Sequence, residues 1–327
     1  MSFLQARTND ALNINPPGGE QHLTVHGSNW LWTVTAIYII ALLFFFGFSF
    51  RARAGELIFH YIYGFALFVG SITYFAMASD LGWSVVITST NRDEARTRQI
   101  FFAKYINWVV SFPAVILALG LLSGVSWATI VYQIFLSWFW VLAYLAGAYT
   151  ATTYKWGFFA FGTVAWMVLC LNQWFVGRKS AQRVDVVHDY SMLLGWLTLL
   201  WLLYPIAWGL SDGGNKIGET AGFIFFGILD VLMLPIMSFI TMGMAGDWDY
   251  SKLNLAFTQY GRVPVVGDNR FPEKNVVTGG PGGSGGPGGS GGPGGPVSDP
   301  APVPASAPAT ENPVGVSAVQ PEGTATV

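Results

Sequence analysis

The sequence predicts an all-α membrane protein: a bundle of seven transmembrane helices, followed by a disordered C-terminal tail. Of the 327 residues, 52% are hydrophobic and only 10% are charged, whereas soluble domains carry about 25% charged residues. About 20 mostly apolar residues are needed to cross the hydrocarbon core as a helix, and seven runs are that long. The predicted spans are Asn29–Phe50, Leu57–Ala78, Ile100–Leu122, Ala128–Ala148, Trp156–Val176, Met192–Leu210 and Gly222–Met244.

The spans divide the chain into three regions: an N-terminal segment (1–28), the membrane domain (29–246) and a C-terminal tail (247–327). Tryptophans border the spans, as interfacial anchors do: Trp30, Trp32, Trp83, Trp127, Trp156, Trp174 and Trp208. Within the tail, residues 279–296 read GGPGGSGGPGGSGGPGGP. Because such a segment has too few large apolar groups to offset the entropy of ordering, we expect disorder from about residue 276.

Seven crossings place the two termini on opposite sides of the membrane, and the positive-inside rule indicates which side each faces. Arg51 and Arg53 directly follow the first span, whereas only Arg7 precedes it. The remaining loop cations are nearly balanced between the two sides. We therefore expect the N-terminus outside and the C-terminus in the cytoplasm.

Charge and cysteine content exclude several classes of function. The net charge is −2, and no cluster of Lys and Arg indicates a nucleic-acid surface. The single cysteine, Cys170, lies within a span and has no cysteine in the chain to pair with. We expect no enzymatic activity, no metal site and no nucleic-acid partner; the partner that composition does indicate is the lipid bilayer.

One carboxylate, Asp230, interrupts the last span. A charged side chain at the centre of the bilayer costs at least about 2.5 to 3.5 kcal/mol, so Asp230 should face the bundle interior and have a partner. Lys104 in the third span is the predicted partner, and Asn107, one turn further, lies on the same helix face. The pair is either a structural tie or part of a ligand or ion site.

Aromatic and acidic residues complete the candidate site. Tyr74 and Tyr204 add phenols at mid-span, and Trp108, Trp201 and Phe159 supply flat rings that could line a pocket or simply pack. Asp212 and Glu219 lie in the loop SDGGNKIGET, near the outer mouth. Loop acids are usually solvated, so the expectation for these two is a solvated pair, with a functional role as the alternative.

Three motifs resemble those of the microbial (type I) rhodopsins, and the resemblance covers roughly residues 29–246. KYINWVVSFP is similar to the family's third-helix segment through Lys104, Asn107, Trp108 and Pro113. The sixth span contains the family's Trp-x-x-Tyr-Pro-x-x-Trp pattern at Trp201, Tyr204, Pro205 and Trp208. ILDVLML resembles the Asp-Val-x-x-Lys motif of the seventh helix at Asp230 and Val231, but Leu234 stands where the family has its retinal-bearing lysine.

The departures from these motifs imply a protein without a covalent chromophore. A Schiff base needs an amine, and Leu234 has none, so covalent retinal is not expected and no other cofactor is indicated. The resemblance also implies that Asn107 replaces the proton-acceptor carboxylate and Ala118 the proton donor. Asp212 and Glu219 match the family's outer acids, so the hypothesis that the outer half of the protein responds to protons remains an alternative.

Further segments resemble the fungal opsin-related branch, which includes heat-shock membrane proteins: INPPGG, GSNWLW, RQIFFAKY, TYKWGF and SDGGN. This resemblance implies a non-photoactive plasma-membrane protein, acting as a stress-associated accessory or regulator, for example of the proton-pumping ATPase. Plasma-membrane transport proteins and further copies of the chain are the implied partners. The alternatives are a passive proton or ion pathway, and noncovalent binding of a small apolar ligand or sterol in the former retinal pocket.

Overall fold

The computed structural model describes residues 9–53, 55–92, 95–253 and 255, all within one compact unit, Met1–Asn269. Within them, seven helices are long and apolar enough to cross a membrane, which confirms the predicted fold class. Three of the seven continue through a π-helical turn. The spans are α2 (Val25–Ser49), α3 (Leu57–Ala78), α4 (Phe102–Ser123), α5 (Trp127–Tyr149), α6 (Lys155–Asn172) with η1 (Gln173–Gly177) and α7 (Arg178–Arg183), α8 (Val187–Trp208) with η2 (Gly209–Gly213), and α9 (Glu219–Val231) with η3 (Leu232–Ile236) and α10 (Met237–Ala245).

Local signals explain where several helices begin and end. Thr24 accepts a hydrogen bond from the Gly27 amide, so α2 begins at Val25, four residues before the predicted start. Ser126 caps α5 in the same way through the Thr129 amide, and such caps satisfy amides that lack a partner within the helix. At the end of α4, Gly124 takes a left-handed conformation with φ of 66°, which terminates the helix.

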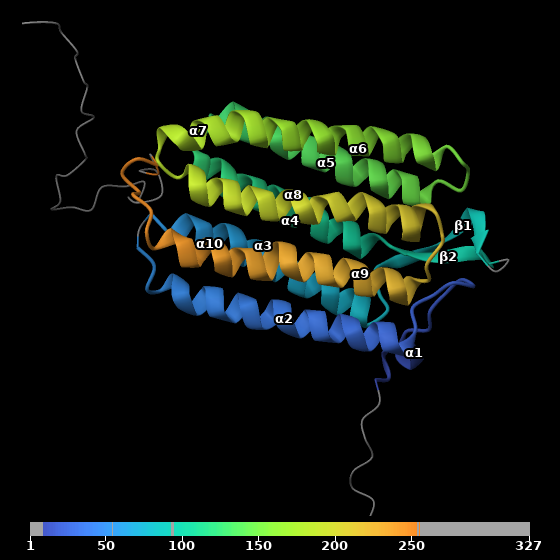
Figure 1. Cartoon of the computed structure of the whole chain (residues 1–327). Helices are drawn as coiled ribbons and strands as arrows, with labels where there is room; N and C mark the ends of the chain where they lie inside the picture. Colours follow the sequence, from blue (N-terminus) through green and yellow to red (C-terminus); the bar gives the residue numbers. More distant parts are fainter. Residues whose placement is uncertain (1–8, 54, 93–94, 254, 256–327) are drawn as a thin grey trace, which may run out of the picture. The chain divides into compact units, whose positions relative to one another are not determined.

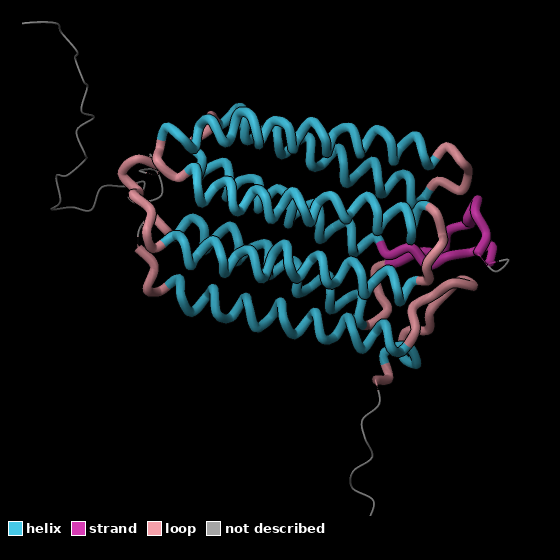
Figure 2. The backbone as a smooth tube through the Cα atoms, in the orientation of Figure 1, coloured by secondary structure: helices cyan, strands magenta, loops and turns pink. Residues whose placement is uncertain are grey.

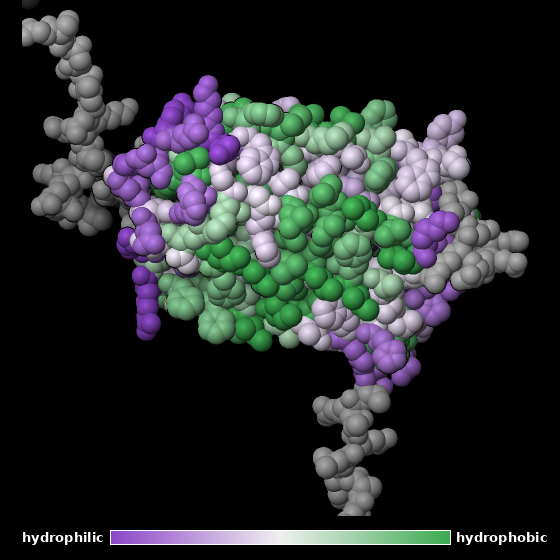
Figure 3. All heavy atoms as spheres, viewed as in Figure 1, coloured by the Kyte–Doolittle hydropathy of each residue, from purple (hydrophilic) through white to green (hydrophobic). Residues whose placement is uncertain are grey.

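Consecutive helices pack side by side, and α9 returns to pack against α2, which closes the bundle (Figures 1 and 2). One end, here called the N-terminal end, carries the short helix α1 (Ala11–Ile14) and a β-hairpin; the other, the C-terminal end, carries α7 and the end of α10. Figure 3 shows hydrophobic residues across the middle of the face in view and hydrophilic residues at both ends. This distribution suits a bilayer around the middle of the bundle.

The hairpin is an addition to the predicted all-helical membrane domain. Strands β1 (Trp83–Arg92) and β2 (Ala95–Phe101) are antiparallel, with Val86 opposite Arg98. The N-terminal segment lies along β2, because Gln21 forms a parallel bridge with Arg98. The sequence signal is the β-branched run from Val85 to Thr88, which is typical of a strand but too short to stand out between two membrane spans.

A buried aspartate ties this end together. Asp80, in the turn after α3, has φ of 56°, and its Oδ1 accepts a hydrogen bond from Gln99 Nε2 at 2.7 Å. The Gln99 side-chain oxygen in turn accepts from the Leu23 amide at 2.9 Å. Burial raises the pKa of the Asp80 carboxyl above its ordinary value, although the Gln99 hydrogen bond and His22 act in the opposite direction. The chain entering α2 is thus attached to the hairpin and to α3.

At the C-terminal end, the chain after α10 folds back onto the bundle. Trp248 is 5% exposed; its Nε1 donates to Asp189 Oδ2 at 2.8 Å, and its ring packs edge-on against Phe59. Leu253 and Leu255 are also buried. The residues predicted to be disordered, from about 276, lie outside the described part of the chain.

Candidate functional site

The interior of the bundle is organised around Asp230, which is fully buried on α9. Tyr74 donates to Oδ2 at 2.5 Å and Tyr204 to Oδ1 at 2.5 Å. Asn107 Nδ2 donates to Oδ2 at 3.1 Å, and Trp108 Nε1 to Oδ1 at 3.0 Å. Neutral donors from α3, α4 and α8 therefore solvate the carboxylate in place of water.

The predicted ion pair between Lys104 and Asp230 does not form. Lys104 Nζ lies 2.6 Å from Asp212 Oδ2, and both side chains are buried. The prediction was wrong because it paired the two oppositely charged residues that fall within predicted spans without comparing their depths, and Lys104 lies in the first turn of α4, at the N-terminal end. Asp212 lies at the same end, in the π-helical turn that extends α8.

Asp212 and Glu219 are also not solvated loop acids, since each is only 3% exposed. They belong to a buried ion network, defined here as Arg98, Lys104, Asp212 and Glu219. Arg98 contacts Glu219 through Nε, and its Nη2 lies 3.9 Å from Asp212 Oδ1. With two cations and two anions the network is charge-balanced, which offsets the cost of burying its members.

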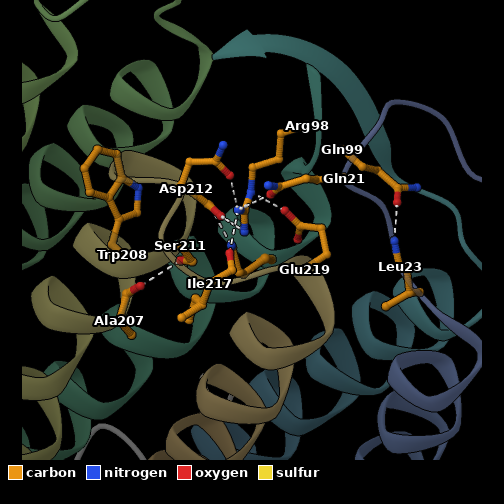
Figure 4. A network of polar contacts seen from close by, with 12 residues as sticks. Gln21, Leu23, Arg98, Gln99, Ala207, Trp208, Ser211, Asp212, Ile217 and Glu219 are labelled. Atoms are coloured by element: carbon orange, nitrogen blue, oxygen red, sulfur yellow. Dashed lines mark hydrogen bonds and ion pairs between the residues drawn. The ribbon is translucent and has the colours of Figure 1, made fainter. Parts of the chain in front are cut away.

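Arg98, which is 0% exposed, is the centre of this network and comes from β2 (Figure 4). Its Nη1 donates to Gln21 Oε1 at 3.1 Å, to Asn215 Oδ1 at 2.8 Å and to the Ile217 carbonyl at 2.8 Å. One guanidinium thus joins the N-terminal segment, the hairpin and the loop between α8 and α9. Sequence reasoning missed Arg98 because it lies outside the spans and was counted only as a loop cation.

Tyr105 and Trp208 extend the network toward the bundle interior. Tyr105 donates to Asp212 Oδ2 at 2.5 Å and accepts from Trp208 Nε1 at 2.9 Å. The Tyr105 ring packs edge-on against Trp108 at 5.1 Å between centroids, and Trp108 donates to Asp230. The ion network around Arg98 and the hydrogen-bonded carboxylate of Asp230 are therefore separated by one layer of aromatic side chains, Tyr105 and Trp108.

Aromatic rings also fill the space beside Asp230. The Phe112 ring centroid lies 4.9 Å from Trp140, 5.2 Å from Tyr204, 5.5 Å from Trp201 and 6.0 Å from Trp108. These five residues form an aromatic cluster in which every ring is almost fully buried. Sequence reasoning identified Trp108, Trp201 and Tyr204 but missed Phe112 and Trp140. The signal for Phe112 was its position, one turn after Trp108 on the same face of α4.

The remaining predicted residues lie around this cluster. Phe159 stacks on Trp208 at 5.3 Å and on Tyr144 at 5.3 Å, so it packs nearer the N-terminal end than Trp201 does. Pro113 and Pro205 lie within α4 and α8. Leu234 is fully buried, one turn after Asp230, in the π-helical turn η3 together with Pro235. A proline has no amide to donate, and a π-helical turn is one way for a helix to accommodate it.

In the described part of the chain, no group of three or more His, Cys, Asp and Glu side chains is arranged to hold a metal ion. The chemically distinctive groups are therefore the caged carboxylate of Asp230 and the buried ion network. Both are closed by side chains of the protein itself. Their role in the fold is to hold helices together: α3, α4, α8 and α9 around Asp230, and the N-terminal segment, the hairpin and the helix ends at the N-terminal end around Arg98.

Comparisons with known proteins agree with this architecture. Residues 26–246 match the family described as bacteriorhodopsin-like protein. The opsin-like protein carO of Fusarium fujikuroi is 34% identical over 85% of this chain and 93% of its own length. The 30 kDa heat shock protein of Saccharomyces cerevisiae is 31% identical over 78% of this chain and 83% of its own length.

A solved structure, the light-driven proton pump LR (Mac) from Leptosphaeria maculans, superimposes with a TM-score of 0.65 at 26% identity. The match covers 72% of this chain and 99% of that one. It spans nearly the whole pump and thus extends to the full seven-helix fold. The chain belongs to the bacteriorhodopsin-like family of multi-pass membrane proteins and has fungal opsin-related homologues.

Proposed function

We propose that this protein is a non-photoactive member of its family, located in the plasma membrane, and that it acts as a stress-associated accessory or regulator of another membrane protein. The observation that carries the proposal is Leu234, which stands at the position of the retinal-bearing lysine and is buried in η3. Leucine offers no amine for a Schiff base. The residues present therefore do not fit covalent retinal.

Two further features support a protein without photochemistry. Asp230 has neutral hydrogen-bond donors on both carboxylate oxygens, so its environment is complete without a protonated Schiff base beside it. The ring centroids of Phe112 and Trp140 lie 5.5 Å and 5.7 Å from that of Trp201, so the aromatic cluster is closely packed. A planar ligand could enter only if the cluster were repacked.

The regulatory role rests on the relatives rather than on a reactive group. The name of one, the 30 kDa heat shock protein, associates it with stress. We propose the plasma-membrane proton ATPase as the regulated partner, with the N-terminus outside and the C-terminus inside. The distribution of charge favours this orientation, because exposed cations gather at the C-terminal end: Arg51, Arg53, Arg178, Lys179, Arg183 and Lys252.

Two experiments test the proposal. Purified protein incubated with all-trans retinal should give no red-shifted, hydroxylamine-sensitive absorption band, and the appearance of one would refute the non-photoactive reading. Proton ATPase reconstituted in liposomes should change its pumping rate when this protein is included. LR (Mac), kept in the dark, is the control for a seven-helix bundle of the same fold. Equal pumping rates with the two proteins would contradict the regulatory role.

A further inference from the structure

A cavity opens at the C-terminal end of the bundle, between α2, α3 and α10, far from the aromatic cluster. Its volume is about 330 Å³, at the lower end of the range of about 300 to 1,000 Å³ that is usual for small-ligand sites. Its lining comes from two kinds of residue. Phe45, Phe48, Phe239 and Met242 form apolar walls, whereas Arg51, Glu56 and His60 contribute polar atoms.

The apolar walls are open to the surface of the bundle. Phe45 is buried, and its ring packs edge-on against Phe239 at 5.2 Å. Phe239 is 40% exposed and Phe48 51% exposed, so the outer wall faces the surroundings of the membrane-spanning helices. A Cβ atom built on Gly243 meets nothing within 4 Å. The cavity is therefore accessible from the side, where lipid chains surround the bundle.

The polar edge of the cavity carries one uncompensated positive charge. Glu56 is paired with Arg53, whose Nε lies 2.6 Å from Glu56 Oε1. Arg51 is exposed, and its guanidinium has neither an ion pair nor a hydrogen bond to any described residue. His60 is buried, with Nδ1 3.3 Å from the Glu56 carbonyl. An anionic group at this edge would therefore meet Arg51 without displacing an existing partner.

Along the membrane normal, the cavity has a cation at its edge and apolar walls deeper in the bundle. A phospholipid has its charged headgroup and its acyl chains in the same order. Arg51 lies two residues beyond the end of α2, at the level where headgroups begin, and Phe45 lies more than one turn deeper. We propose that the cavity binds an anionic phospholipid, with its headgroup at Arg51 and one acyl chain against Phe45, Phe48 and Phe239. Basic sites between transmembrane helices bind anionic headgroups in this way. The apolar walls would add nothing to the binding of a free phosphate ion.

Native mass spectrometry of the full-length protein tests this assignment. The detergent-solubilised protein is titrated with palmitoyl-oleoyl phosphatidylserine, with phosphatidylcholine carrying the same chains, and with glycerol 3-phosphate. We expect one tightly retained phosphatidylserine, weaker phosphatidylcholine and no glycerol phosphate. Arg51→Gln should lower the preference for phosphatidylserine by about fivefold, the contribution of one arginine near an anionic headgroup. Lys179→Gln, an exposed cation at the same end, is its matched control and should leave the preference unchanged.

A second pair of variants tests the apolar walls. Gly243→Leu places a side chain in the open space of the cavity and should abolish retention of both lipids. Gly47→Leu, at a glycine of α2 that also has open space around it and does not line the cavity, should retain both. Equal loss in Arg51→Gln and Lys179→Gln would refute the site in favour of general surface charge. Binding of glycerol phosphate as tight as that of phosphatidylserine, or undiminished lipid binding by Gly243→Leu, would refute it as well.

Discussion

Lys104 and Asp212 form a direct buried ion pair, with Nζ 2.6 Å from Oδ2. The pair joins the start of α4 to the end of α8, 108 residues later in the chain. The two buried aspartates are therefore stabilised differently. Lys104 balances the charge of Asp212, whereas Asp230 accepts hydrogen bonds from neutral groups alone. Each aspartate gives a different expectation for mutants.

Lys104→Met alone should destabilise the protein by about 3 to 5 kcal/mol, because it leaves the Asp212 carboxylate buried without its nearest cation. Lys104→Met combined with Asp212→Asn should be less destabilised than Lys104→Met, since the charge is removed along with its partner. Unfolding in detergent measures both. Lys104→Met with Asp230→Asn is the matched control and should show no recovery. Recovery in the control but not in the Asp212 double variant would contradict the pairing.

Leu234→Lys alone should not produce a pigment with all-trans retinal, because the closely packed rings of Phe112, Trp140 and Trp201 would have to separate to admit the polyene. Leu234→Lys combined with Phe112→Ala removes one of these rings and should allow a red-shifted, hydroxylamine-sensitive band. Absorption spectroscopy after incubation with retinal distinguishes the two variants. A pigment formed equally well by the single variant would mean that the aromatic cluster does not exclude the polyene.

Asp230→Asn should leave the proton permeability of liposomes unchanged. The carboxylate is enclosed by donors from α3, α4 and α8. Met233 and Leu234, the buried residues that follow in η3, have no group that could relay a proton. Permeability is measured with an internal pH-sensitive dye after an imposed pH step. A leak in the wild type that Asp230→Asn abolishes would instead identify a passive pathway through this residue.

Asp80→Asn should stabilise the protein at pH 7. Because burial raises the pKa of Asp80 in the folded state, the folded state holds its proton more tightly than the unfolded state does. Stability is therefore lost as pH rises from about 4, the ordinary pKa of Asp, through the raised value, and that loss is complete at higher pH. Asparagine removes the charge and also tolerates the positive φ of this position.

The measurement is the melting temperature of both proteins between pH 4 and pH 7. The difference should be largest at pH 7 and shrink as the pH falls toward 4. A difference that is constant across this range would mean that the ionisation of Asp80 does not contribute, and a difference that grows on acidification would reverse the assigned direction. Asp249→Asn, at an exposed site beyond α10, is a control for removal of one acidic charge.

Much of the fold was predictable because the bilayer imposes a length and a polarity on every span. The seven runs of apolar residues needed no tertiary information, and the motif around Trp201 and Tyr204 correctly indicated side chains that meet inside the bundle. The start of α2 differed by four residues because Thr24 supplies a cap that hydropathy does not register. Hydropathy also gave no indication of the hairpin, since β1 and β2 lie between spans.

Pairing inside the site was less predictable, because it depends on the height of each residue along the bundle. Lys104 and Asp230 are the oppositely charged residues that fall within the predicted spans, yet they lie at different depths. The π-helical turn at Gly209–Gly213 extends α8 and brings Asp212 inside, where a loop was expected. Phe112 fills space between α4, α5 and α8, and its place on one face of α4 does not report which rings of the other two helices surround it.

The contacts of Arg98 also bear on the order in which the protein assembles in the membrane. Arg98 and Lys104 emerge from the ribosome more than 100 residues before their acidic partners, Asp212 and Glu219. Until α8, η2 and α9 have been inserted, both cations lack their acidic partners and are expected to remain hydrated at the membrane surface. The ion network at the N-terminal end can therefore form only after the whole bundle has been inserted. In a chain truncated before α9, Arg98 would lack Glu219 and would stay accessible to proteases and chaperones that recognise unfolded protein.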